Sequence, residues 1–217
     1  MDFIEHTLTV KRSAHVYTAG NLEEPGGILW LVAHGYGQTG SRIISKFNQL
    51  NHNTHKIICP EALSLFYWGG VHGPHAASWM TSKNRLDEIE DFCNYLDQVY
   101  NDFIRSQKPS KIILLGFSQG ATTLYRWVHS RKPLFDHFIN WAGWMPEDID
   151  MEVVSESFMD KHIIVFGEED QYLTEDRIKM MNEYLAKAGM NPTFQKFKGK
   201  HEISRDALNE TIKILKL

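Results

Sequence analysis

Ile112-Ile-Leu-Leu115, followed directly by Gly116-Phe-Ser-Gln-Gly120, is the stretch that decides the fold. A run of four apolar residues is typical of a strand that is buried on both faces of a mainly parallel sheet. The residues from 121 to 127 then predict a helix. A sharp turn between strand and helix leaves no room for side chains beside its central residue, so glycines are needed on either side of Ser118. The stretch therefore predicts a strand, a tight turn that carries Ser118, and a helix.

The same kind of pattern extends along the chain in both directions. Other continuous apolar runs predict further buried strands, and segments between them show the apolar spacing of helices. The predicted strands are Ile28 to Ala33, Lys56 to Cys59, His137 to Trp141, Ile163 to Phe166 and Thr193 to Phe197. The predicted helices are Arg85 to Ser106, a segment from Thr174 to near Gly189, and Ile203 to Leu217.

The helix from Arg85 to Ser106 has the clearest pattern. Asn84 is its predicted N-cap, and Pro109 follows its end. Its apolar residues recur at intervals of three and four, which places them on one face. That face is Leu86, Ile89, Cys93, Leu96, Tyr100 and Phe103.

The start of the chain has a different pattern. Apolar and polar residues alternate from Phe3 to Val10, as in a half-exposed strand, and His15 to Ala19 is its predicted antiparallel partner. Strands that alternate with helices after such a start predict an α/β three-layer sandwich with a mostly parallel central sheet and an antiparallel N-terminal edge. We expect one domain over residues 1–217 with no large cap domain. The longest irregular stretch, Pro60 to Lys83, has a length at which loops are usually functional.

Composition limits the classes of protein to consider. With 42% hydrophobic and 23% charged residues, the 217-residue chain is typical of a folded globular protein. Its 23 basic and 27 acidic residues give a net charge of −4, which favours neither nucleic acid nor an anionic membrane as a partner. Charges interrupt the apolar residues of the first six positions, which predicts no signal peptide, and no apolar run is long enough to span a bilayer. We expect a soluble, cytoplasmic protein without stable membrane association, in which Cys59 and Cys93 are reduced core residues.

Ser118 needs a base, and the base needs a carboxylate, if the serine is to act as a nucleophile. On a fold with this strand–turn–helix, the chain order is serine, acid, histidine. Four histidines follow Ser118: His129, His137, His162 and His201. The first three fall on a predicted helix or at strand positions, whereas His201 lies in the loop after a predicted strand, where open α/β sheets build their sites. His201 is therefore the predicted base.

The carboxylate is expected in the loop after the strand Ile163 to Phe166. That loop contains Glu168, Glu169 and Asp170, and we select Asp170. Its predicted role is to hold the His201 tautomer and stabilise the imidazolium. Glu168 and Glu169 are the alternative carboxylates, which we interpret as solvated residues of the turn.

An oxyanion formed during acyl transfer needs two backbone N–H donors. One is predicted at Gln119, directly after the nucleophile and at the positive end of its helix. The other is predicted at Tyr36, in the loop His34-Gly-Tyr-Gly-Gln-Thr-Gly40, whose glycines allow the backbone to approach a ligand.

Four motifs together resemble the phospholipase/carboxylesterase family of α/β-hydrolases, which includes acyl-protein thioesterases and small bacterial carboxylesterases. They are the loop from His34 to Gly40, the turn from Gly116 to Gly120, Gly167-Glu-Glu-Asp170 and Gly199-Lys-His201. The resemblance covers nearly the whole chain and implies the same Ser118–Asp170–His201 triad and the Tyr36/Gln119 donors. It implies no cofactor.

Weaker patterns leave alternatives open. Two histidine pairs, His52/His55 and His72/His75, suggest a metal, but neither has a third ligand nearby, and we predict no metal. Large apolar side chains after the strands predict a substrate groove. Its predicted members are Trp79, Trp144, Met145, Tyr172 and Leu173.

The predicted activity is hydrolysis of carboxylic esters with short or medium acyl chains through an acyl-enzyme at Ser118. A small-molecule ester or thioester is the expected substrate. Hydrolysis of longer acyl thioesters or lysophospholipids is the alternative, and a peptidase or a binding protein that has lost catalysis are more remote ones.

Overall fold

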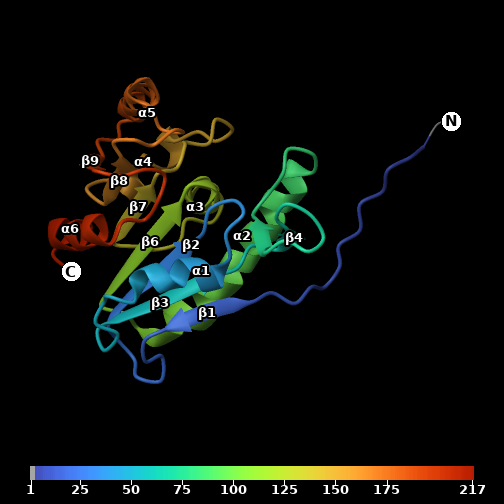
Figure 1. The fold of residues 1–217 in the computed structure, drawn as a ribbon, viewed down its shortest axis with the longest axis horizontal. Helices are drawn as coiled ribbons and strands as arrows, with labels where there is room; N and C mark the ends of the chain where they lie inside the picture. The colour runs from blue at the N-terminus through green and yellow to red at the C-terminus, as the bar shows by residue number, and fades with distance from the viewer. Residues whose placement is uncertain (1–2) are drawn as a thin grey trace.

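A seven-stranded sheet forms the centre of the computed structural model, which describes residues 3–217 (Figure 1). Its strand order is β1-β3-β2-β6-β7-β8-β9, with β1 antiparallel to β3 and every other neighbouring pair parallel. The strands are β1 (Val16–Ala19), β2 (Ile28–Ala33), β3 (His55–Pro60), β6 (Lys111–Phe117), β7 (His137–Trp141), β8 (His162–Gly167) and β9 (Thr193–Phe197). The predicted mostly parallel sheet with an antiparallel edge is confirmed.

Helices cover both faces of this sheet. They are α1 (Gly40–Ile44), α2 (Arg85–Val99), α3 (Gln119–Arg131), α4 (Ser155–Phe158), α5 (Glu175–Lys187) and α6 (Arg205–Leu215). The connection through α1 steps from β2 to β3, whereas those through α2 and α3 step the other way across the sheet. Because parallel crossovers are right-handed, α1 lies on the opposite face from α2 and α3, which gives the three layers of an α/β sandwich.

The apolar runs became strands because both of their faces are covered. Residues 29–33 of β2 and 113–115 of β6 are fully buried, and these two strands are neighbours at the middle of the sheet. The helix predicted from Arg85 to Ser106 is also present, since α2 continues through a wider turn over Tyr100–Ile104 and a 3₁₀ turn over Arg105–Gln107.

Details at the ends of elements differ from the prediction. Asn84 precedes α2 but its side chain makes no capping hydrogen bond. Leu86, predicted on the buried face, is exposed because it lies in the first turn, before α2 reaches the core. Thr174 is the N-cap of α5 as predicted, and its side chain accepts a hydrogen bond from the Arg177 N–H.

The prediction of a strand from Phe3 to Val10 is wrong. This segment forms no strand and runs away from the body of the molecule with its apolar side chains exposed (Figure 1). The edge strand β1 pairs with β3 instead, in the register Val16 with Pro60. Alternation alone gives no stable strand where no neighbouring chain supplies hydrogen bonds and a surface to cover.

The stretch from Pro60 to Lys83 is not irregular throughout. It contains a separate antiparallel hairpin of β4 (Ser64–Tyr67) and β5 (His75–Ser78). No helix within residues 3–217 is both long and apolar enough to cross a membrane. Met1 and Asp2 lie outside the described residues. Both belong to the predicted domain over residues 1–217 and to the first six positions, on which the prediction of no signal peptide is based.

Candidate active site

Ser118 occupies the tight turn between β6 and α3. Its backbone has φ 53° and ψ −119°, a strained conformation for a residue with a side chain. The neighbouring glycines are required by close approach: a Cβ at Gly116 would lie 2.3 Å from the Ala121 Cα, and one at Gly120 only 2.1 Å from the Ala33 carbonyl oxygen. The Ser118 N–H donates to the Trp141 carbonyl at 2.8 Å, which ties the turn to β7.

His201 and Asp170 meet Ser118 in a continuous chain of hydrogen bonds. The distance from His201 Nε2 to Ser118 Oγ is 2.9 Å, and that from His201 Nδ1 to Asp170 Oδ2 is 2.8 Å. Asp170 follows β8 and His201 follows β9, so all three side chains come from loops at the carboxyl ends of parallel strands. A carboxylate only accepts, so Nδ1 carries the proton and Nε2 is left to accept the Ser118 hydroxyl.

Asp170 is fixed by more than the histidine. Its Oδ1 accepts backbone N–H groups from Tyr172 at 2.8 Å and Leu173 at 3.1 Å, and its side chain is completely buried. Glu168 and Glu169, the alternatives in the same loop, are exposed. Of the other three histidines after Ser118, His162 is buried against Tyr125, and His129 and His137 lie on α3 and β7.

The loop from residue 34 to 40 lies against the Ser118 turn. A Cβ at Gly35 would be 3.2 Å from the Ser118 Cβ. The backbone N–H groups of Tyr36 and Gln119 find no acceptor in the described part of the chain, so both remain available as donors. The Gln119 side chain acts elsewhere, because its amide accepts from the Trp79 N–H and donates to the Met80 carbonyl, which holds the end of β5 against α3.

His34 begins this loop and supports it from inside the protein. Its Nε2 accepts the Ala62 N–H at 3.0 Å, so its Nδ1 carries the hydrogen and donates to the Gly35 carbonyl at 2.8 Å. Burial lowers the pKa of His34 to about 4, which keeps the ring neutral. Trp79 is buried beside it and donates its indole N–H to the His34 carbonyl at 2.8 Å.

Comparison with known sequences decides which family these features represent. A sequence model of the phospholipase/carboxylesterase family matches residues 23–217, a span that includes the Ser118 turn, the 34–40 loop, Asp170 and His201. The chain belongs to the phospholipase/carboxylesterase family. The resemblance based on the four motifs is therefore confirmed, and an α/β-hydrolase that cleaves esters or thioesters is the class of enzyme that this family indicates.

Solved structures of this family's fold agree. Acyl-protein thioesterase 2 of Zea mays matches with a TM-score of 0.69 and 16% identity, covering 94% of this chain and 98% of that one. Esterase PE8 also matches with a TM-score of 0.69, at 18% identity over 94% of this chain and 99% of that one. At such identities the likeness concerns the fold. No curated protein sequence matches the chain significantly.

A groove of about 590 Å³ opens beside Gln119, the residue after Ser118. Two of the predicted substrate residues, Trp144 and Met145, line it together with Met80 and Thr122. Tyr172 is half-exposed and stacks edge-on against the His201 ring, with 4.7 Å between ring centroids.

The other two predicted substrate residues have structural roles. Trp79 and Leu173 are buried and are not among the residues that line this groove. Trp79 supports the 34–40 loop, and the Leu173 backbone holds Asp170.

An ion-pair cluster in the wall of the groove has no sequence pattern that predicts it. Asp148 accepts hydrogen bonds from the Arg126 guanidinium at 2.7 and 3.0 Å and pairs with Arg85 as well. Burial alone would raise the pKa of Asp148, but the hydrogen bonds from the two arginines lower it to about 2. The three residues come from the start of α2, from α3 and from the segment after β7, so the cluster joins three elements around one end of the groove.

Metal-ligating side chains do not gather in threes or more anywhere in residues 3–217 in a way that could hold an ion. Of the two histidine pairs, His55 is buried and its Nδ1 accepts the Trp30 indole N–H at 3.0 Å. Both His72 and His75 are exposed. Cys59 and Cys93 are buried free thiols, as predicted, and burial raises the pKa of Cys93 to about 12.

Proposed function

We propose that this protein is a serine hydrolase that cleaves carboxylic esters of short or medium acyl chains through an acyl-enzyme on Ser118. The observation that carries the proposal is the unbroken hydrogen-bond chain from Ser118 Oγ through His201 to Asp170. Such a chain gives an ordinary serine a base within reach and gives that base a fixed tautomer.

In the first half of the reaction, His201 Nε2 takes the hydroxyl proton while Ser118 Oγ attacks the acyl carbon. The tetrahedral intermediate collapses when the bond to the leaving alcohol breaks, and His201 returns the proton to that alcohol oxygen. Asp170 stays ionised and stabilises the imidazolium between the two transfers.

In the second half, a water molecule gives its proton to His201 Nε2 as its oxygen attacks the acyl carbon. The bond to Ser118 Oγ breaks, the serine oxygen regains the proton from His201, and the carboxylic acid leaves. The free N–H groups of Tyr36 and Gln119 are the proposed donors to the oxyanion in both halves.

The proposed acyl length follows from the groove beside Gln119. Its apolar part contains Met80, Trp144 and Met145, while Arg85 and Asp148 belong to the same lining. Each buried methylene adds about 0.8 kcal/mol of affinity, so rate should increase with chain length only as far as the apolar part extends. Beyond the apolar part, the acyl chain would contact the ion pairs of Asp148 with Arg85 and Arg126 and displace water from them.

The test of catalysis is a set of three variants assayed on p-nitrophenyl butyrate. Ser118→Ala should remove turnover and labelling by a fluorophosphonate probe without changing the circular dichroism spectrum. His201→Ala should cost nearly as much, since such residues act as a unit. Ser130→Ala, a matched change at an exposed serine of α3, should leave turnover unchanged. Full activity of the Ser118 variant would contradict the proposal.

The test of substrate class is kcat/KM across p-nitrophenyl esters and acyl thioesters of graded length. We expect a maximum at short or medium chains. A value that still increased at palmitoyl length would instead favour the thioesterase or lysophospholipase alternative.

A further inference from the structure

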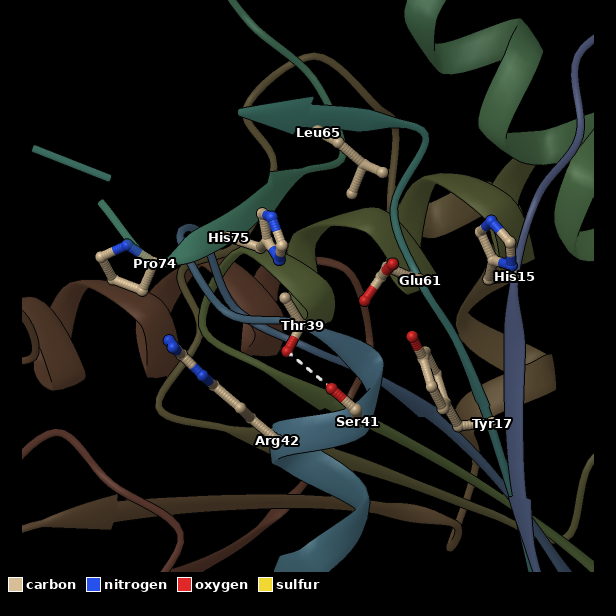
Figure 2. Close-up of a pocket in the computed structure, with 9 residues that line it drawn as sticks. All are labelled: His15, Tyr17, Thr39, Ser41, Arg42, Glu61, Leu65, Pro74 and His75. Carbon is tan, nitrogen blue, oxygen red and sulfur yellow. Dashed lines mark hydrogen bonds between the residues drawn. The ribbon is translucent and has the colours of Figure 1, made fainter. Parts of the chain in front are cut away.

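A second cavity, about 510 Å³ in volume, shares no lining residue with the groove beside Gln119. It lies where the 34–40 loop enters α1, between β1, the segment after β3 and the β4–β5 hairpin (Figure 2). Nothing in the proposed hydrolysis uses these residues. Its lining includes an acidic side chain, Glu61, a basic one, Arg42, and the hydroxyl groups of Tyr17, Thr39 and Ser41.

Glu61 is the central feature of this cavity. Its side chain is directed into the space in Figure 2, although the residue is only 7% exposed. Oε1 accepts one hydrogen bond, from the Gly40 N–H at 3.2 Å, and no other donor or cation pairs with the carboxylate within residues 3–217. A buried carboxylate normally has several donors, because leaving it short of them is costly. The second carboxylate oxygen is therefore free to accept from a ligand.

Tyr17 forms an aromatic wall next to this carboxylate. Its ring packs on the start of α1, where a Cβ at Gly40 would lie 2.7 Å from the Tyr17 Cδ2. Figure 2 shows its hydroxyl turned toward Glu61. A carboxylate beside a hydroxyl can bind an ammonium group, through a charge-assisted hydrogen bond to the carboxylate and a second hydrogen bond to the hydroxyl oxygen.

A positive charge stands on the other side of the same cavity. Arg42 lies across from Glu61 in Figure 2, and these two charges form no ion pair with each other or with any side chain of residues 3–217. Between them, the hydroxyls of Thr39 and Ser41 are hydrogen-bonded to each other at 3.1 Å. The guanidinium and the hydroxyls suit a carboxylate group.

We propose that this cavity binds a small amino acid or another zwitterion of similar size, with its ammonium group on Glu61 and its carboxylate on Arg42. A simple amine would leave Arg42 unpaired and be repelled by it, and a simple carboxylate would be repelled by Glu61. Only a ligand with both charges satisfies the two ends. Binding here also concerns the loop whose other end touches Ser118, because Glu61 holds the Gly40 N–H.

The test is a titration of the full chain with glycine, 4-aminobutanoate and 6-aminohexanoate, in which isothermal titration calorimetry or NMR measures binding. Butylamine and butanoate serve as probes with one charge removed. We expect saturable binding of at least one amino acid, with about tenfold weaker binding of either single-charge probe, the loss that follows from removing one charge-assisted hydrogen bond. Absence of saturable binding by all three amino acids, or equal binding of butylamine, would overturn the proposal.

Two variants locate the ligand. Glu61→Gln keeps an acceptor for the Gly40 N–H and should lower amino acid affinity about tenfold or more. Arg42→Gln, at an exposed position that should not affect folding, should reduce amino acid binding to the level of butylamine. Glu210→Gln on α6 is the matched control and should bind as the unchanged protein does. Unchanged affinity in the Arg42 variant would contradict the proposal even if the Glu61 variant failed to fold.

The result is separable from the proposed hydrolysis. Ser118→Ala should bind the amino acid with unchanged affinity, because Ser118 does not line this cavity. Binding lost in that variant would place the ligand in the candidate active site and overturn the second site.

Discussion

Asp170 shows how a single side chain can be held in one orientation by its own loop. Its two oxygens have different partners: Oδ2 accepts from His201, while Oδ1 accepts from the backbone two and three residues further on. The rings of Phe117 and Tyr172 also pack against His201, with centroid distances of 5.0 and 4.7 Å, and restrict the orientation of the imidazole.

We predict that Asp170→Asn will lower kcat/KM for p-nitrophenyl butyrate by up to about 10⁴-fold. The amide would donate to Nδ1 and force the hydrogen to Nε2, where it would face Ser118 and remove the base. Glu169→Gln changes an exposed neighbour in the same loop and should leave the rate within about twofold, as expected for a surface change. If the glutamate variant lost the activity and the Asp170 variant kept it, the assignment of the carboxylate would be wrong.

Buried neutral histidines make the stability of the protein depend on pH in acid. Burial lowers the pKa of His34 to about 4 and that of His162 to about 3, both below the 6.5 of an unfolded histidine. Between these values the unfolded chain binds more protons than the folded one, so stability is complete above pH 6.5 and falls as the pH drops toward 4. Each histidine contributes a slope of about 1.4 kcal/mol per pH unit in that window.

The measurement is urea unfolding between neutral pH and the acid limit of solubility. His162→Gln can keep a hydrogen bond to Tyr125 and should make the free energy of unfolding less dependent on pH. His72→Gln, in the exposed turn of the hairpin, should reproduce the dependence of the unchanged protein. Identical slopes for the unchanged protein and the His162 variant would contradict this account.

Elements with strong local patterns could be predicted from the sequence. A strand covered on both faces, such as β2, must be apolar throughout. In a helix with one covered face, such as α2, apolar residues must recur at intervals of three and four. The hairpin of β4 and β5 was missed because its strands are four residues long and contain the weak strand formers Ala76, Ala77 and Ser78.

The candidate site divides in the same way. Ser118 and the 34–40 loop could be predicted because the sharp turn and the close backbone approach require glycines at fixed spacing. The cluster of Asp148 with Arg85 and Arg126 could not, because its members come from three elements and only the packing of those elements brings them together. The separate cavity at Glu61 is of the same kind, since it joins β1, α1 and the hairpin.

The turn between β6 and α3 leaves no room for a side chain at Gly120. Gly120→Ala would place a Cβ 2.1 Å from the Ala33 carbonyl oxygen, which must move together with the start of the 34–40 loop. We expect a loss of at least about 2 kcal/mol in the free energy of unfolding and a large loss of esterase activity.

Gly26→Ala is the matched control for this change. Gly26 has φ +90° but no atom within 4 Å of the added Cβ, so the cost should be only the backbone strain, about 1–2 kcal/mol, with activity retained. Equal loss of activity in both variants would mean that the close approach at Gly120 does not matter for the site.

The first and last strands of the chain, β1 and β9, are the two edges of the same seven-stranded sheet. The central strands β2 and β6 have β3 and β1 on one side and β7, β8 and β9 on the other. One hydrophobic cluster contains buried side chains from Leu29 to Leu215. The exposed segment from Phe3 to Val10 contributes nothing to it.

We therefore predict that residues 1–217 unfold as one domain. Because the cluster is continuous from β3 to β9 and the side chains of β1 pack against it, no subset of strands can lose its partners without exposing the core of the rest. Tryptophan fluorescence and far-UV circular dichroism should therefore give coincident transitions in urea, and the calorimetric and van't Hoff enthalpies should agree. Buried tryptophans on β2, α3 and β7 report on the centre of the sheet and on the helix that covers it. Removal of residues 1–13 should leave the transition unchanged, because the side chains of residues 3–13 are exposed. Within residues 3–217, the first contact with the body is at the His15 carbonyl, which accepts hydrogen bonds from the Glu61 N–H and the Tyr95 hydroxyl. Two separate transitions in the full chain would show that the predicted single domain is wrong, and a lower midpoint after truncation would show that the N-terminal segment packs on the body in solution.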